Sequence, residues 1–172
     1  MTVKEEELKK VGLPSQEVIE QTESDLIEGL LFAAKEKFGD DEQKTIVIKR
    51  CGKPAFSFKV RPLTEDELMR IRKQSTPRYP NPQNKKIPIE GEIRYGEFRS
   101  RKIYTATVEE KSGAKIWDNP KVKQGLIAQG HEIMETWEII DKVLLAGEKD
   151  SVSDVIDEIS GYESDLTEYA KN

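Results

Sequence analysis

The sequence predicts an α+β fold: a mostly helical single domain with a small β-hairpin or antiparallel sheet and mobile termini. Two short strand-like segments lie within residues 45–60, and a helix-capping motif follows at residues 64–67. Apolar residues recur at helical spacing in residues 24–38 and 131–159. The chain has 172 residues, of which 35% are hydrophobic and 35% charged, so we expect one domain with a modest core.

The charged ends of the chain set the expected domain boundaries. Residues 1–21 are weakly patterned, which predicts a flexible N-terminal segment, and residues 163–172 form an acidic C-terminal tail. The folded domain is therefore expected over residues 22–162. Its first helix is predicted from Ser24 to Phe38, with Gly39 at its end. One face of this helix collects Leu26, Ile27, Leu30, Leu31, Ala34 and Phe38.

A β-hairpin is predicted next. Residues 45–49 are rich in β-branched side chains, and residues 56–60 alternate apolar with polar side chains. Gly52, Lys53 and Pro54 between them have turn chemistry. Because two strands alone are marginally stable, the hairpin must pack against a helix.

The clearest local signal is a capping box at Thr64 and Glu67. Each side chain can accept a hydrogen bond from the backbone N–H of the other residue, and Leu63 and Leu68 flank the box as a hydrophobic staple. We therefore predict a helix from Glu65 to Gln74. Residues 76–92 hold four of the eight prolines, which predicts a basic loop or extended arm.

The sequence predicts the secondary structure of the later segments less clearly. Residues 95–110 fit either a strand or a helix. A short helix is expected to begin at Pro120, another to span 131–145 and end at Gly147, and the last to open at Ser151 and close at Gly161. These last elements supply most of the apolar helical faces of the chain.

The charge is distributed unevenly along the chain. Residues 49–111 hold 16 basic and 8 acidic residues, a net charge of +8, whereas residues 1–48 and 141–172 each carry −6. A basic middle can mark a nucleic-acid surface. The alternative, which we favour, is that the acidic ends fold back on the basic middle or that all these charges are solvated.

Several classes of function are excluded or disfavoured. No apolar run approaches the ~20 residues of a membrane helix, the first ten residues do not resemble a secretory signal, and the single cysteine allows no internal disulfide. Cys51 and His131 could in principle form a nucleophile–base pair, but no third group is evident to orient them, so we interpret their presence as coincidence. Trp117 and Trp137 are expected as core anchors. We predict a protein that is not an enzyme and takes no cofactor or metal.

Four segments together resemble the XkdN-like family of phage and prophage tail assembly chaperones. They are residues 56–65, the proline-rich basic stretch, residues 103–108 followed by 117–119, and residues 137–148 ending in 159–162. Ala146 stands where family members typically have proline. The resemblance covers roughly residues 45–162 and implies that residues 95–110 are helical.

The resemblance implies a chaperone made in the host bacterial cytoplasm and absent from the mature virion. Its expected partners are the tape measure protein and possibly the major tail tube protein, which it keeps soluble during tail assembly; self-association is left open. Many members also have a frameshifted longer form, and this chain would match the shorter one. We place the partner-binding groove among the helices around Tyr104, Trp137, Ile140 and Leu144, where apolar residues are in surplus.

Two alternatives remain at this stage. One is a nucleic-acid-binding or regulatory phage protein that uses residues 49–111. The other is a structural tail or connector component, which would stay in purified particles.

Overall fold

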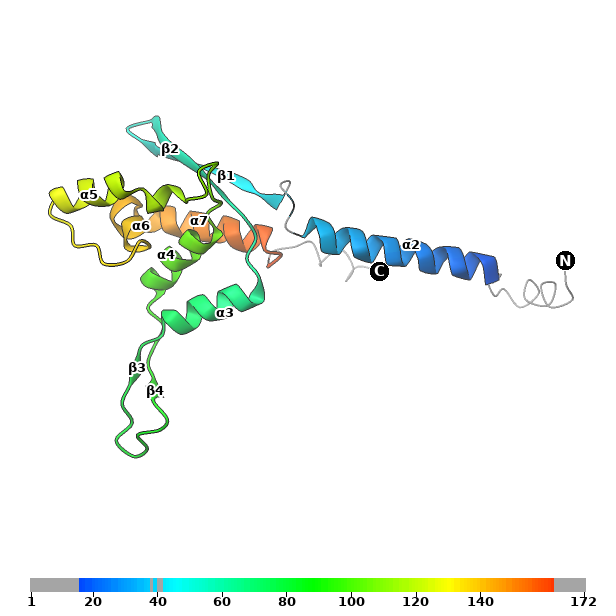
Figure 1. Ribbon diagram of the computed structural model, residues 1–172, viewed down its shortest axis with the longest axis horizontal. Coiled ribbons are helices and arrows are strands. Elements are labelled where there is room, and N and C mark those ends of the chain that lie inside the picture. The colour runs from blue at the N-terminus through cyan, green and yellow to red at the C-terminus, as the bar shows by residue number, and fades with distance from the viewer. Residues whose placement is uncertain (1–15, 38, 40–41, 163–172) are drawn as a thin grey trace, which may run out of the picture. The chain divides into compact units, whose positions relative to one another are not determined.

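The computed structural model describes residues 16–37, 39 and 42–162, with side chains from residue 23 onward (Figure 1). Residues 1–15 of the predicted flexible segment 1–21 and the predicted tail 163–172 lie outside the described residues, whereas residues 16–21 belong to a helix. The chain divides into two compact units, Met1–Gly39 and Asp40–Asn172. About half of the residues are helical, and two small antiparallel sheets accompany the helices, so the predicted mostly helical α+β fold is confirmed.

The described part of the first unit is one long helix, α2 (Gln16–Glu36). It begins eight residues before the predicted start at Ser24. The added turns are rich in glutamate and glutamine, which are good helix formers but give no apolar pattern to read. The backbone N–H of Gly39 donates to the carbonyl of Glu36 at 3.0 Å just beyond the helix.

The second unit begins with the predicted hairpin, β1 (Lys44–Arg50) and β2 (Lys53–Val60). Their antiparallel register runs from Lys44 opposite Val60, with a bulge after Ile48. The turn is tighter than predicted, because Cys51 and Gly52 form it alone with φ of 51° and 74°. Two successive positive φ angles suit the twist of a two-residue hairpin.

Helix α3 (Glu65–Gln74) begins where the capping box predicted and has the predicted span. The Thr64 hydroxyl accepts from the N–H of Glu67 at 3.2 Å, and the Glu67 carboxylate accepts from the N–H of Thr64 at 3.0 Å. The following arm carries two short paired strands, β3 (Arg78–Tyr79) and β4 (Ile89–Glu90), and extends from α3 and α4 in Figure 1. The predicted extended arm is therefore confirmed.

Residues 95–106 form helix α4 (Tyr95–Ala106), as the family resemblance implied and against their local strand propensity. The helix stops where the chain rejoins the hairpin: Thr107 forms a β-bridge with Val60, and the N–H of Val108 donates to the carbonyl of Lys59 at 2.8 Å. A short 3₁₀ turn, η2 (Ile116–Asp118), and helix α5 (Pro120–Ala128) follow, with Pro120 at the predicted start.

The prediction of one helix over residues 131–145 is wrong. Helix α6 spans only Glu138–Val143, and residues 131–137 lie outside any helix, with a bend and a turn at 134–137. The Glu138 carboxylate accepts from the N–H groups of Met134 at 2.6 Å and Glu135 at 2.9 Å. These bonds satisfy the preceding backbone N–H groups outside a helix, so the helix begins seven residues, about two turns, later than its apolar pattern predicts.

The predicted boundary at Gly147 and Ser151 is also wrong. Helix α7 (Ala146–Ile159) begins before both residues, because Glu148 accepts from the N–H of Leu145 at 2.8 Å and caps the helix there. Its end is as predicted, with Gly161 at φ 90° and the N–H of Tyr162 bonded to Asp157 at 3.0 Å. Arg50 ties this junction to the hairpin through Glu148 and the carbonyl of Val143.

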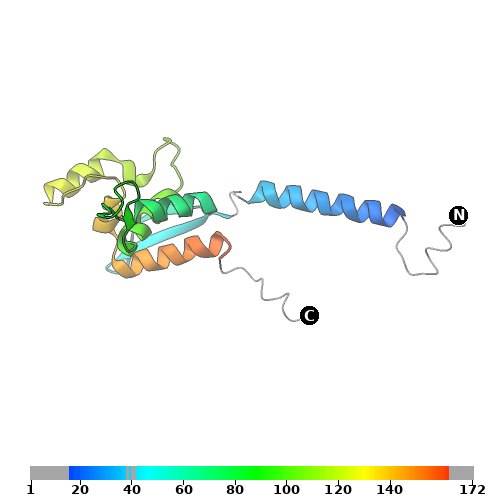
Figure 2. The ribbon, with the colours of Figure 1, turned by 90° about the horizontal axis from the view of Figure 1, so that it is seen from below.

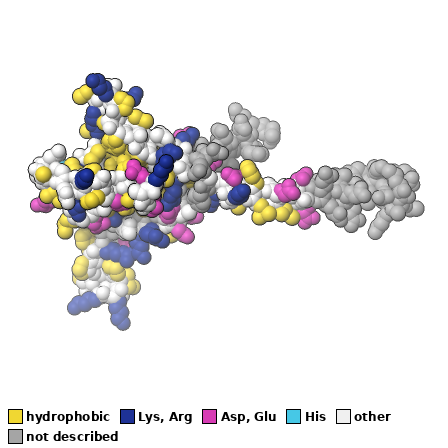
Figure 3. Space-filling view, turned by 45° about the horizontal axis from the view of Figure 1, so that its top comes forward, with side chains coloured by type: hydrophobic (Ala, Val, Ile, Leu, Met, Phe, Trp, Pro, Cys, Tyr) yellow, Lys and Arg dark blue, Asp and Glu magenta, His cyan; other side chains and the backbone are white. Residues whose placement is uncertain are grey.

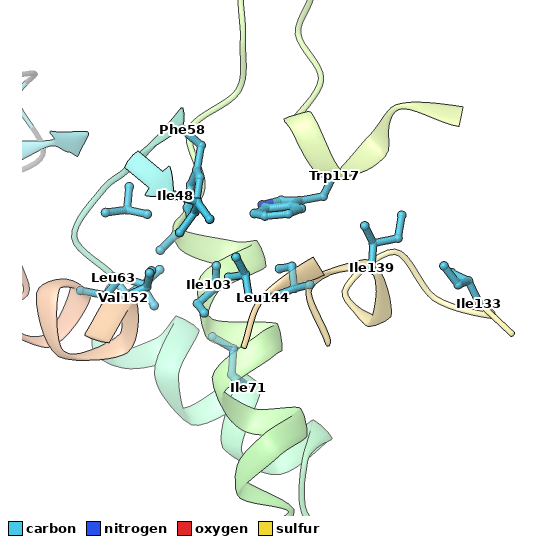
Figure 4. Packing of buried hydrophobic residues seen from close by; sticks show 14 residues of the cluster. Ile48, Phe58, Leu63, Ile71, Ile103, Trp117, Ile133, Ile139, Leu144 and Val152 are labelled. Atoms are coloured by element: carbon cyan, nitrogen blue, oxygen red, sulfur yellow. The ribbon is translucent and has the colours of Figure 1, made fainter. Parts of the chain in front are cut away.

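The core lies between the hairpin, α4, α6 and α7 (Figure 4). Helix α7 runs beside β1, as Figure 2 also shows. Trp117 is 3% exposed and meets Phe58 edge-on at 5.2 Å between ring centroids, while its indole N–H donates to Thr107 at 2.9 Å. Trp117 is the predicted core anchor, whereas Trp137 is only half-buried.

The capping box gives a pH-dependent prediction. Hydrogen bonds from the Arg61 guanidinium lower the pKa of Glu67 from 4.5 to about 2. This carboxylate therefore stabilises the fold above pH 4.5, and its contribution is lost as the pH falls toward 2. We expect Glu67→Gln to lower the free energy of unfolding at neutral pH by about 1–2 kcal/mol. The difference in stability between the wild type and the variant should shrink as the pH falls. Urea unfolding of both proteins across this pH range measures the difference. If the free energy of unfolding of the two proteins changed in parallel with pH, the assignment would be contradicted.

A buried cation gives a second prediction. Lys102 is 2% exposed, and its ammonium lies 2.6 Å from Asp157 and 2.9 Å from Ser153 Oγ. Asp157→Asn leaves that charge buried without its carboxylate and should cost about 2 kcal/mol. Adding Lys102→Met removes the stranded charge and should restore stability to within about 1 kcal/mol of the wild type. Denaturant titrations of the single and double variants measure their free energies of unfolding. If the Asp157→Asn protein were as stable as the wild type, Asp157 would not be stabilising the buried charge of Lys102.

Candidate functional site

Several exposed large apolar side chains lie close together in the sequence of α2. Leu26, Ile27, Leu30 and Leu31 are 61%, 50%, 62% and 66% exposed. Their spacing places them on one side of the helix, together with Ala34, and Figure 3 shows apolar side chains gathered along it. We call these five residues the α2 stripe. A stripe of this kind resembles the face that an amphipathic helix normally buries against a partner.

The predicted groove residues separate into two pairs. Ile140 and Leu144 are 0% and 5% exposed and belong to the core cluster. Tyr104 and Trp137 line one hollow of about 420 Å³, with Arg101 and the exposed Met134 at its edge. The structure therefore brings Tyr104 and Trp137 together at one hollow, whereas Ile140 and Leu144 are buried in the core.

Both aromatic rings of this hollow are already covered by cations of the same chain. The Arg101 guanidinium lies 4.7 Å from the centroid of Trp137, and the Lys115 ammonium lies 4.7 Å from that of Tyr104. Trp137 Nε1 donates to Glu135 at 2.9 Å, and the Tyr104 hydroxyl donates to Asp118 at 2.8 Å. Arg101 also lines the hollow, so a partner that reached the Trp137 ring there would meet this guanidinium.

A larger groove of about 660 Å³ lies beside the hairpin. Phe56, Ile116, Trp117, Val122 and Val143 form its apolar part. Within this lining Phe56 and Trp117 meet edge-on, at 5.9 Å between ring centroids. The sequence analysis placed Trp117 in the core, which is correct, and gave no sign that it also walls a groove.

Part of the positive charge in the basic middle of the chain is paired with carboxylates. Several of its basic residues pair with nearby carboxylates, and Glu148, Asp150 and Asp157 of the acidic C-terminal region supply three of them. The paired residues are Arg50, Arg61, Arg78, Arg94, Arg99, Arg101 and Lys102, seven of the 16 basic residues in 49–111. The acidic C-terminal region therefore folds back on the basic middle, as the favoured interpretation expected of the acidic ends.

No catalytic grouping emerges from the described residues. Cys51 is exposed at the hairpin tip, His131 lies between α5 and α6, and no hydrogen bond joins them. In the part of the chain that the structure describes, no three His, Cys, Asp or Glu side chains are grouped to hold a metal ion. The described helices include none that is long and apolar enough to cross a membrane.

Sequence comparison decides the family. The family described as phage XkdN-like tail assembly chaperone protein matches residues 28–172. The chain belongs to this family. No curated protein matches it. The crystal structure of the protein YqbN, a structural genomics target, aligns with a TM-score of 0.41 and 14% identity over 70% of this chain and 87% of that one.

Membership of this chaperone family confirms the resemblance drawn from the sequence and the general role in phage tail assembly. The family match begins at residue 28, so it includes Leu30 and Leu31 of the α2 stripe. The sequence analysis placed these leucines on one helix face but gave that face no role. One sequence feature could have indicated a role for this face. The apolar stripe lies between a weakly patterned segment and a charged loop, so neither sequence neighbour offers it an amphipathic partner.

The hollow gives a prediction for Tyr104. Burial, together with the hydrogen bond to Asp118, raises the pKa of Tyr104 from 10.0 to about 12. At pH 11, where ordinary tyrosines are largely ionised, the wild type and Tyr104→Phe should therefore show nearly equal absorbance at 295 nm. An absorbance lower in the variant by about a fifth, one of five tyrosines, would show that Tyr104 titrates normally. Far-UV circular dichroism at the same pH checks that both proteins remain folded.

Proposed function

We propose that this chaperone binds the tape measure protein, a very long helical chain, and keeps it soluble while the tail tube polymerises around it. The major tail tube protein is a possible second client. The activity is binding alone, without catalysis. We further propose that the chaperone acts in the host bacterial cytoplasm and is left out of the mature virion.

The α2 stripe is the observation that carries this proposal. A helical client that is not yet assembled exposes apolar faces along its length, and it aggregates through them. An exposed stripe on the chaperone covers such a face by helix-to-helix packing. Binding removes client from the pool that aggregates, by mass action and without chemistry.

The hollow at Tyr104 and Trp137 is a second proposed contact. Its rings lie under Arg101 and Lys115, so it suits a client segment that offers carboxylates to those cations as well as apolar contact. Ile140 and Leu144 contribute by supporting the hollow from within the core. The family domain proposed for residues 22–162 would then hold both surfaces.

The proposal is tested by co-expression with the long helical protein encoded just downstream. The chaperone should raise the soluble fraction of that protein and co-elute with it from a sizing column. Leu30→Asp places a charge in the α2 stripe and should weaken client binding by at least tenfold, because a buried leucine contributes about 2 kcal/mol. Phe32→Asp is the matched control: Phe32 is 67% exposed on the opposite side of the same helix and should change binding little.

The other outcomes are equally decisive. If Trp137→Ala abolishes co-elution while Leu30→Asp does not, the client binds the hollow and not the stripe. If neither co-elution nor rescue occurs, the chaperone–client proposal fails. Salt-sensitive binding to nucleic acid between ~50 and 200 mM salt would then favour the basic middle. Recovery of the protein in purified particles would favour a structural tail or connector component.

A further inference from the structure

We infer that the outer edge of β1 is a docking site for an acidic, extended segment of a partner protein, which joins the hairpin as a third strand. The hairpin forms a two-stranded sheet of its own, so β1 has a neighbouring strand on one side only. Strand addition combines main-chain hydrogen bonds, which give affinity, with contacts of alternate side chains, which give specificity. The inference concerns the hairpin alone and does not depend on the client proposed above.

The main chain of β1 has unused hydrogen-bonding groups at Thr45 and Val47. Lys59 of β2 lies opposite Thr45, and its carbonyl accepts from the N–H of Val108 at 2.8 Å, on the side away from β1. Opposite residues of an antiparallel pair either bond to each other or both point outward, so the main-chain groups of Thr45 point to the outer edge. Those of Val47, which lies opposite Ser57, point the same way. Among the described residues, no hydrogen bond uses the N–H or carbonyl of Thr45 or Val47.

The side chains beside this edge are exposed and basic. Val47 is 48% exposed, and Lys49 follows it on the same face of the strand. Four lysines of the hairpin are exposed, and none of them forms an ion pair with a carboxylate of the described residues. They are Lys44, Lys49, Lys53 and Lys59. Residues 44–61 contain six basic and no acidic residues, so the hairpin itself offers these lysines no carboxylate.

Charge selects the occupant of the edge. A second copy of β1 would bring the same lysines and no carboxylate, so like charges disfavour pairing between two copies. Nucleic acid would meet the lysines but has no row of alternating N–H and carbonyl groups to pair with the strand. An antiparallel protein segment with a carboxylate opposite Lys49 and a β-branched residue opposite Val47 satisfies both side chains and the free main-chain groups. We therefore expect an acidic and a β-branched residue two positions apart in the partner segment.

A designed peptide tests the edge in the full-length protein. The probe is acetyl-Glu-Thr-Val-Thr-Thr-Glu-amide, which in the antiparallel orientation sets its valine opposite Val47 and its glutamates opposite Lys49 and Lys44. The third and fifth residues of the peptide then direct their N–H groups at β1, and the second and fourth direct theirs away. N-methylation of the third and fifth residues should weaken binding at least about tenfold, because two hydrogen bonds are lost. N-methylation of the second and fourth residues is the matched control and should change binding little.

Variants of the protein complete the test. Val47→Pro removes the N–H at the edge, which the hairpin itself does not use, and should weaken peptide binding, whereas Val47→Thr keeps that N–H and should not. Lys49→Glu should weaken binding about fivefold. Lys85→Glu is its control, because Lys85 is equally exposed but lies on the arm between β3 and β4, away from the hairpin (Figure 1). The N-methylated peptides keep the test decisive if the proline variant does not fold.

The measurement is a titration of the ¹⁵N-labelled protein followed by NMR. We expect the largest shifts at the amide signals of Thr45 and Val47. Absence of binding at millimolar peptide, or equal weakening by the two N-methylation patterns, would overturn the inference. Tighter binding of a ten-nucleotide oligothymidylate than of the peptide would also overturn it and would assign the lysines to nucleic acid. No client is present in the titration, so failure here leaves the proposed client binding untouched.

Discussion

A two-stranded hairpin cannot stand alone, and the second unit of this protein is organised around covering it. Phe58 and Val60 of β2 turn inward and are 5% and 0% exposed. Trp117 covers the hairpin from one side, and Ile103 and Ala106 at the end of α4 lie against its base. The bridge between Val60 and Thr107 then fixes where α4 ends. Each neighbouring element is therefore placed by the apolar face of the hairpin.

The sequence predicted the elements whose signals are local. The hairpin, the capping box of α3 and the glycine end of α7 depend on residues within a few positions of each other. The starts of α6 and α7 were predicted wrongly, because the carboxylates of Glu138 and Glu148 define them through bonds to backbone N–H groups outside the helices. Arg50, nearly a hundred residues away, holds Glu148 in place. No local pattern carries that information.

In the candidate site, too, local sequence patterns predicted some features and missed others. Apolar spacing found the faces of α2 and α6, but it does not tell which face is buried. Ile140 of α6 is in the core and Leu30 of α2 is exposed, although both fit their helical patterns equally well. Charge was more informative: the acidic C-terminal region does pair with the basic middle, through Glu148, Asp150 and Asp157. That pairing leaves less positive charge to bind nucleic acid.

A chaperone of a growing assembly must hold its client and then release it, and the proposed surface suits that demand. Four large apolar side chains contribute about 6–10 kcal/mol on burial, and association costs at least about 4 kcal/mol of that. One stripe therefore binds weakly and dissociates readily. A very long helical client would present many such faces, and several chaperone molecules would then bind along it. Tube subunits that polymerise along the client would then displace the chaperone one weak contact at a time.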